Sequence, residues 1–197
     1  MMHLAGRLVL TPFRAEASFN AMHNDVHNSR SQPPAAGNRA PDWNARYLQG
    51  DIPWDQHSTT HILDRVVREF SIPPSRALEM GCGTGRNAIH LARLGFELTA
   101  FDLAPRAIEL AHVNARQAGV DIGFHAADFR HLPNLGAPFP FVFDSGFYHC
   151  VRREMLDNLL AFLERVTQPG SLWLTLAGNA NDPQPGEKGP PRLRWML

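Results

Sequence analysis

The sequence predicts an α/β fold in which a parallel sheet carries helices on both faces. Three observations support this. Short apolar runs alternate with helix-patterned segments from about residue 58 onward, as is typical of doubly wound sheets. The first of these runs leads into three alternating glycines, Gly81, Gly83 and Gly85. Acidic residues also stand at the ends of successive apolar runs, where such sheets bind their ligands. These acids are Glu79, Asp102, Asp128 and Asp144.

The expected elements follow one another in strict alternation. We predict helices over residues 58–70, 87–94, 105–119 and 153–167, and strands over 76–80, 97–101, 122–125, 141–144 and 172–177. Ser58 suits a helix N-cap, and Pro105 occupies the favoured first turn of its helix. Gly95 is a typical signal for a helix C-terminus. The alternation predicts parallel strands joined by right-handed crossovers.

The N-terminal part of the chain has a different composition. Residues 24–41 are rich in Asn, Ser, Pro and Gly, so we predict that residues 1–41 are disordered or only loosely attached. From residue 42 the composition changes, and aromatic residues appear within a dozen positions. We therefore expect one folded domain over residues 42–197.

The overall composition restricts the possible partners. The chain has 197 residues, with 19 Lys+Arg and 19 Asp+Glu, so no basic excess predicts binding to nucleic acid. No apolar run is long enough to cross a membrane. Cys82 and Cys150 are too few for a disulfide framework. We expect a cytoplasmic protein without a nucleic-acid or membrane partner.

The spacing of the glycines distinguishes between two cofactors. Dinucleotide sites carry G-x-G-x-x-G with a pyrophosphate at the helix N-terminus, whereas this turn reads G-x-G-x-G. Glu79 stands two residues before the first glycine. A carboxylate there would repel a pyrophosphate, but it suits the cationic amino-acid end of a ligand. Asp102, after the next strand, can accept hydrogen bonds from ribose hydroxyls.

Together these residues resemble the class I S-adenosylmethionine-dependent methyltransferases, whose first motif reads E-x-G-x-G-x-G. The resemblance implies a Rossmann-like sheet with strand order 3-2-1-4-5 and S-adenosyl-L-methionine as cofactor. It also implies that Asp128 accepts from the adenine amino group, that Phe129 packs on that ring, and that Asp144 borders the methyl group. The alternative for Asp128 is the cap of a short turn. The implied cofactor contacts in this part of the chain are Glu79, Gly81, Gly83, Asp102, Leu103, Asp128, Phe129 and Asp144.

A second segment narrows the resemblance. Residues 43–47 and the sequence Pro53-Trp54-Asp55 resemble the N-terminal lid of the thiopurine and thiol/halide methyltransferases. This implies that Trp43, Tyr47 and Trp54 border the cofactor, where aromatic faces can stabilise a sulfonium by up to about 2 kcal/mol. The alternative is an apolar anchor for an N-terminal helix.

The implied reaction is methyl transfer to a small molecule that offers a thiol, a halide or a hydroxyl or heterocyclic group. His149 either orients or deprotonates this acceptor, or is structural. No residue is assigned as catalytic. His57 and His61 have metal-binding spacing, but no third ligand is evident, so no metal site is expected. The alternatives are an NAD(P)-binding oxidoreductase and an inactive fragment that binds S-adenosylmethionine.

The C-terminal part of the chain differs from the family pattern. After the fifth strand come a Gly/Pro-rich stretch, residues 178–191, and only six further residues. We therefore expect the last two strands of the class I sheet to be missing and the domain to be incomplete at its C-terminus. The edge formed by residues 172–176 would then be open to pairing, giving a monomer or an edge-paired dimer.

Overall fold

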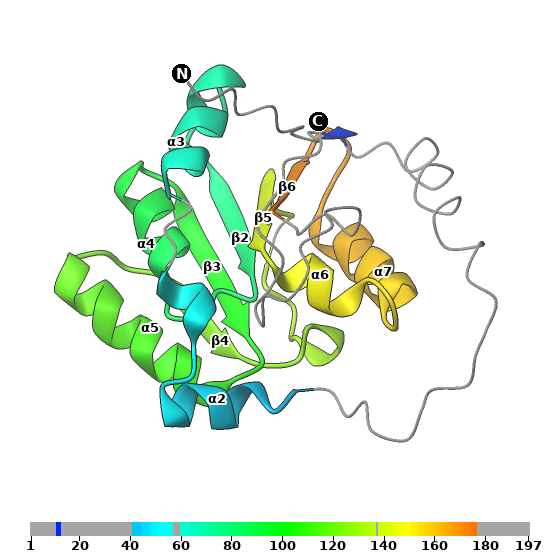
Figure 1. The fold of residues 1–197 in the computed structure, drawn as a ribbon. Helices are drawn as coiled ribbons and strands as arrows, with labels where there is room; N and C mark the ends of the chain where they lie inside the picture. Colours follow the sequence, from blue (N-terminus) through cyan, green and yellow to red (C-terminus); the bar gives the residue numbers. More distant parts are fainter. Residues whose placement is uncertain (1–10, 13–40, 57–59, 137, 177–197) are drawn as a thin grey trace, which may run out of the picture.

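A computed structural model of the chain describes residues 11–12, 41–56, 60–136 and 138–176. The described residues form a sheet with helices on both faces (Figure 1), which confirms the predicted α/β fold. The strands are β1 (Thr11–Pro12), β2 (Arg76–Met80), β3 (Glu97–Asp102), β4 (Gly123–Ala126), β5 (Phe141–Ser145) and β6 (Leu172–Leu176). They lie in the order β1-β6-β5-β2-β3-β4. Strands β2 to β6 are parallel, and their order is the predicted 3-2-1-4-5.

The helices connect these strands. They are α2 (Trp43–Gln49), α3 (Thr60–Glu69), α4 (Arg86–Arg93), α5 (Pro105–Ala118), α6 (Phe147–Val151) and α7 (Leu156–Val166), with short 3-10 turns η1 (Pro53–Gln56) and η2 (Phe129–His131). The helix α6 was not predicted, and α7 begins three residues later than expected. Gly146, at φ 90°, reverses the chain directly before α6, and the Asp144 carboxylate accepts a hydrogen bond from the Tyr148 N–H, 2.9 Å away.

The two faces of the sheet bury different clusters. Successive residues of a strand point to opposite faces, so Leu78 and Met80 pack against α7, while Ala77 packs against α3 and α4. Both faces of the central strands are therefore buried, as expected for a doubly wound parallel sheet. This burial fixes the carboxyl ends of β2, β3 and β5 side by side, and register pairs Met80 with both Phe101 and Asp144.

The outer edge of β6 differs from the expectation of an open edge. Strand β1 pairs with it in antiparallel orientation, with Thr11 opposite Trp173 and Pro12 opposite Leu172. Pro12 suits an edge strand because it has no N–H to donate to a further strand. The partner comes from the segment predicted to be loosely attached, so no local pattern near β6 could have indicated it.

Residues 42–56, which we call the strap, lie across the carboxyl ends of the strands and pack on α5 (Figure 1). Tyr47 is buried against Ala104 and Ala107. The Asn44 side chain accepts a hydrogen bond of 2.9 Å from the Arg106 N–H, which is one of the amides that a helix N-terminus leaves without an intrahelical partner. The strap is thus attached to the core by an apolar contact and by a helix cap.

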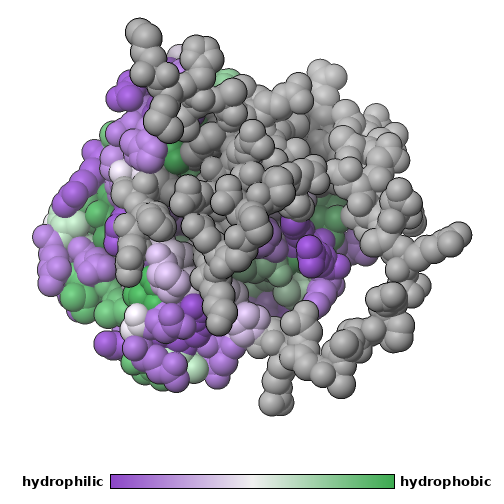
Figure 2. All heavy atoms as spheres, in the orientation of Figure 1, coloured by the Kyte–Doolittle hydropathy of each residue, from purple (hydrophilic) through white to green (hydrophobic). Residues whose placement is uncertain are grey.

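Hydrophilic and hydrophobic residues are interspersed over the visible surface around α2 and α5 (Figure 2). Among the described residues, no helix is both long enough and apolar enough to cross a lipid bilayer.

Candidate functional site

The glycine turn after β2 is closely surrounded by protein. Gly81, Gly83 and Gly85 all have positive φ, at 65°, 53° and 78°. A Cβ on Gly81 would lie 3.0 Å from the Phe147 Cβ, and one on Gly83 would lie 2.8 Å from the Tyr47 hydroxyl oxygen. Both backbone conformation and space therefore require glycine at these two positions. The turn runs between Tyr47 of the strap and Phe147 of α6.

Asp102 lies beside this turn at the end of β3. Its Oδ2 accepts a hydrogen bond of 2.9 Å from the Gly83 N–H, and its Oδ1 accepts one of 2.9 Å from the Ala104 N–H. Burial raises the pKa of the carboxyl group, and these backbone donors partly offset the effect. Each carboxylate oxygen keeps capacity for a second donor. The neighbouring Leu103 is 56% exposed and is available to contact a ligand.

Glu79 is 1% exposed and lies at the same end of the sheet. The Asn87 side chain donates a hydrogen bond of 3.3 Å to its Oε1, but Oε2 is buried without a partner. Burial raises the pKa of Glu79 to about 8. An unsatisfied buried carboxylate oxygen is costly, and a cationic donor would relieve that cost. Glu79 therefore has the chemistry of a site for a ligand ammonium group.

Asp144, at the end of β5, is fully buried. Its oxygens accept hydrogen bonds from the Tyr148 N–H at 2.9 Å and from the Trp173 indole N–H at 3.0 Å. Burial raises its pKa to about 6. These bonds hold α6 and β6 to the end of β5, so the contacts seen here are structural. Its predicted place beside the methyl group stays a prediction.

The residues predicted to contact adenine have protein partners. Asp128 accepts a hydrogen bond of 2.9 Å from the Arg130 N–H and forms an ion pair with the Arg130 guanidinium. This pairing lowers the pKa of Asp128. Phe129 is 4% exposed, and its ring contacts those of Phe147 and Phe162 at 5.4 and 5.8 Å between centroids. The Phe129 ring is a core residue here, and its adenine contact stays a prediction.

The strap aromatic residues form one cluster. The Trp54 ring lies 5.4 Å from that of Trp43 and 5.9 Å from that of Tyr47, and its indole N–H donates a hydrogen bond of 3.1 Å to the Tyr47 hydroxyl. The Arg46 guanidinium lies 4.3 Å from the Trp54 ring centroid. Burial, together with the Asp102 charge, raises the pKa of Tyr47. Tyr47 thus reaches both Gly83 and the neighbourhood of Asp102.

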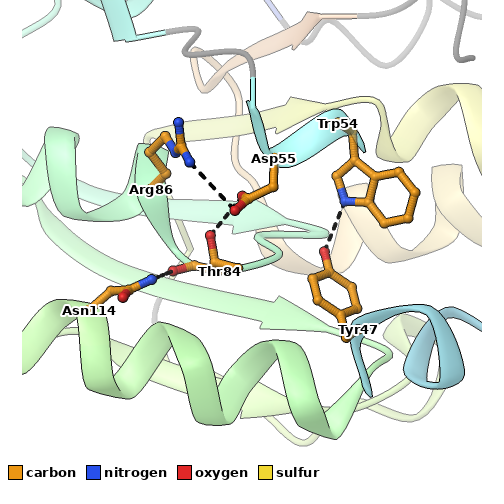
Figure 3. A network of polar contacts seen from close by, with 6 residues as sticks. All are labelled: Tyr47, Trp54, Asp55, Thr84, Arg86 and Asn114. Carbon is orange, nitrogen blue, oxygen red and sulfur yellow. Dashed lines mark hydrogen bonds and ion pairs between the residues drawn. The ribbon is translucent and has the colours of Figure 1, made fainter. Parts of the chain in front are cut away.

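Several polar contacts around the turn were missed by sequence reasoning. Asp55 of η1 accepts a hydrogen bond of 2.7 Å from the Thr84 hydroxyl, although the two residues are 29 positions apart in the sequence (Figure 3). The Asn114 side chain donates a hydrogen bond of 3.0 Å to the Thr84 carbonyl oxygen. Asp55 belongs to the Pro53-Trp54-Asp55 sequence and Thr84 lies between two glycines, but neither pattern indicates a contact between the two residues.

The structure also locates the candidate histidines and cysteines. The Nδ1 atom of His149, in α6, is buried without a hydrogen-bond partner, and its pKa is lowered by burial and by Arg152 and Arg153. His57 lies outside the described residues. Within the described ranges, no three His, Cys, Asp or Glu side chains cluster as metal ligands. Cys82 and Cys150 are both free thiols.

A family model described as a methyltransferase domain matches residues 77–170, the part that contains the glycine turn and all four acidic strand ends. Residues 77–170 form a class I S-adenosylmethionine-dependent methyltransferase domain. Its finer assignment to the thiopurine and thiol/halide group stays a prediction.

Similar proteins include enzymes and one solved structure. The ubiquinone biosynthesis O-methyltransferase of Xanthomonas campestris is 32% identical over 97 residues, covering 49% of this chain and 38% of that protein. The 2-heptyl-1-hydroxyquinolin-4(1H)-one methyltransferase of Mycobacteroides abscessus is 28% identical over 126 residues, covering 61% of this chain and 56% of that protein. A structure described as "Conversion of a Disulfide Bond into a Thioacetal Group during Echinomycin Biosynthesis" is 32% identical, with a TM-score of 0.54. The match covers 58% of this chain and 49% of that one. The chain thus spans roughly half or less of the length of these proteins.

The methyltransferase domain fits S-adenosylmethionine, the cofactor of its family. The Oε2 atom of Glu79, which has no hydrogen-bond partner, suits the ammonium group of the cofactor. The pyrophosphate of a dinucleotide is negatively charged and would be repelled by this carboxylate. The Asp102 carboxylate suits the ribose hydroxyls. Both carboxylates therefore have the chemistry that this cofactor requires, and their contacts with it stay predictions.

Proposed function

We propose that this protein is an S-adenosylmethionine-dependent methyltransferase that acts on a small molecule. The observation that carries the proposal is the pair of buried carboxylates around the glycine turn, Asp102 bonded to Gly83 and Glu79 with one oxygen free. Asp102 accepts from the ribose and Glu79 from the ammonium group. When bound, S-adenosylmethionine supplies a methyl group on a sulfonium sulfur, and the protein mainly aligns the acceptor with it.

The remaining predicted contacts complete the proposed site. Leu103 packs on the nucleoside beside Asp102, and Asp128 accepts from the adenine amino group. Tyr47 and Trp54, with Trp43 behind them, exclude water from the sulfonium side. The Tyr47 hydroxyl oxygen already lies against Gly83, which supports this placement of the strap.

The acceptor that we propose is a small heterocyclic molecule methylated at oxygen or sulfur. The name of the Mycobacteroides abscessus relative specifies a hydroxyquinolinone, and the echinomycin structure concerns sulfur chemistry. The equal numbers of acidic and basic residues do not favour a nucleic acid. This choice includes the thiol acceptors implied by the lid resemblance.

For a hydroxyl acceptor we assign the proton to His149. Its side chain is half-buried in α6, and its lowered pKa keeps the imidazole neutral at neutral pH. A neutral imidazole can take the proton that the acceptor hydroxyl loses as it is methylated. A thiolate acceptor has already lost its proton and needs no such residue.

The two free cysteines also support a reducing compartment, and we propose a cytoplasmic location. Among the described residues, β1 pairs with Leu172 and Trp173 of β6, and we propose either a monomer or a dimer paired through the rest of this edge.

Calorimetry with S-adenosylmethionine and with its demethylated product tests the cofactor assignment. We expect both to bind the wild-type protein with a stoichiometry of one. NADH serves as the comparison, because binding of NADH as tight as that of S-adenosylmethionine would favour an oxidoreductase. The absence of heat for either sulfur compound would contradict the proposal. A screen of hydroxylated heterocycles and thiols with labelled cofactor then identifies the acceptor.

A further inference from the structure

The strap meets the glycine turn through side chains that have no assigned role in cofactor binding. Asp55 Oδ1 accepts the 2.7 Å hydrogen bond from Thr84, and Asp55 Oδ2 lies 3.5 Å from the Arg86 guanidinium (Figure 3). Thr84 is 6% exposed, so its hydroxyl is shielded from water. Its carbonyl oxygen is held by Asn114 of α5. One residue of the turn therefore links the strap to a core helix.

The neighbours of Asp55 are the strap aromatics. Trp54 precedes it directly, and Trp54 donates its indole N–H to Tyr47, whose hydroxyl oxygen lies against Gly83. Asp55 and Tyr47 thus contact adjacent residues of the turn, Thr84 and Gly83. Two contacts at adjacent positions fix the strap in orientation as well as in distance.

We propose that Asp55 is a positioning residue, whose hydrogen bond to Thr84 holds the strap on the glycine turn and thereby sets how long the cofactor stays bound. The inference rests on the proposed function, since it assigns the cofactor to this turn. Without the bond, Trp54 and Tyr47 lose their fixed place over the turn, and the cofactor leaves more readily.

The Thr84 bond, and not the ion pair, dominates this contact. A short hydrogen bond to a carboxylate is stronger than one between neutral groups, and burial of the donor strengthens it further. The Arg86 pair is longer, and the Arg86 side chain is 43% exposed, so water screens it. Removing the Thr84 hydroxyl should therefore matter much more than removing the Arg86 charge.

The first test measures release of the demethylated cofactor by stopped flow. We expect Thr84→Val and Asp55→Ala each to speed release on the order of tenfold, the scale of a hydrogen bond to a charged group. The double variant should be no faster than either single one, because both remove the same bond. Thr84→Ser keeps the donor and should restore slow release. Arg86→Gln should change the rate by less than about twofold.

A matched control removes a similar hydroxyl elsewhere. Thr167, the C-cap residue of α7, donates a hydrogen bond of 2.6 Å to the Leu163 carbonyl oxygen in that helix. Thr167→Val should leave release unchanged. Unchanged release in Thr84→Val, or additive effects of Asp55→Ala and Thr84→Val, would overturn the proposal.

A second test needs no cofactor. The Arg106 amide is held by Asn44 of the strap, so its hydrogen exchange reports whether the strap is docked. In the ligand-free protein, Thr84→Val and Asp55→Ala should speed exchange at Arg106, whereas Thr84→Ser should not. Equal exchange in all variants would contradict the positioning role. If the wild-type protein bound no cofactor, the proposed function would fail while this measurement still decided the role of Asp55.

Discussion

The Gly83 N–H donates a hydrogen bond of 2.9 Å to the Asp102 carboxylate, so the glycine turn and the tip of β3 hold each other. The same carboxylate accepts from the Ala104 N–H, also at 2.9 Å. Asp102 therefore shapes the turn and, in the proposed function, also binds the ribose.

Asp102→Asn tests this double role. The amide side chain of this variant has a single oxygen, which can accept from one of the two backbone N–H groups. Its NH₂ group, itself a donor, then faces the other N–H group. We expect the dissociation constant for S-adenosylmethionine to rise about 10- to 100-fold, the scale of one hydrogen bond to a charged group. Calorimetry measures the change. Asp121→Asn, at an exposed acid before β4, should bind as the wild type does, and equal affinity of both variants would exclude the ribose contact.

The raised pKa of Glu79 leads us to expect that the protein releases a proton when the cofactor binds. With a pKa of about 8, Glu79 is mostly protonated at pH 7 in the ligand-free protein. A bound ammonium group favours the ionised form, so binding should release close to one proton. Titration calorimetry in buffers of different ionisation enthalpy counts that proton. Glu79→Gln should bind with almost no release, and a wild-type protein that released none would argue against the ammonium contact.

Glu79 also predicts a pH dependence of stability. Its folded pKa of about 8 lies above the ordinary value of 4.5, so the folded state keeps a proton that the unfolded state loses between these values. Stability should therefore fall as pH rises from 4.5 to 8, by up to about 5 kcal/mol from this residue. Urea unfolding of the wild type and of Glu79→Gln at both ends of this range measures the effect. Parallel stability curves would show that Glu79 ionises normally.

If His149 takes the proton of a hydroxyl acceptor, its loss should affect kcat for hydroxyl and thiol acceptors differently. His149→Asn should lower kcat for a hydroxyl acceptor by about 100-fold or more but change kcat for a thiol acceptor little. In the wild type, kcat for the hydroxyl acceptor should rise with pH through a pKa below 6.5, because only neutral imidazole accepts a proton. His61→Asn, exposed on α3, is the control. Equal losses for both acceptor types would make His149 structural.

The strands and the acidic strand ends could be predicted because their signals are local. The first strand was predicted over residues 76–80, which are the bounds of β2, and Asp102 was placed at the tip of the next strand. Apolar runs, glycines with positive φ and an early proline each depend on a few neighbouring residues. Local backbone chemistry therefore accounts for the turn itself.

The contacts that cross between elements could not be predicted. The bond between Asp55 and Thr84 joins residues 29 positions apart, and α6 is too short, at five residues, to show a helical period. The ring of Phe129 is enclosed by Phe147 and Phe162, which depends on how α6 and α7 pack. These features follow from tertiary packing and leave no periodic signal in the sequence.

The attachment of the strap has a consequence for where the cooperative folding unit begins. The family match starts at residue 77, yet Asn44 completes the N-terminal cap of α5, and Tyr47 is buried on that helix. A shortened protein starting between the strap and β2 would leave the Arg106 amide without its acceptor and would expose Ala104 and Ala107 to water. The packing of this domain therefore includes the strap, which lies well before the recognisable motifs of the domain.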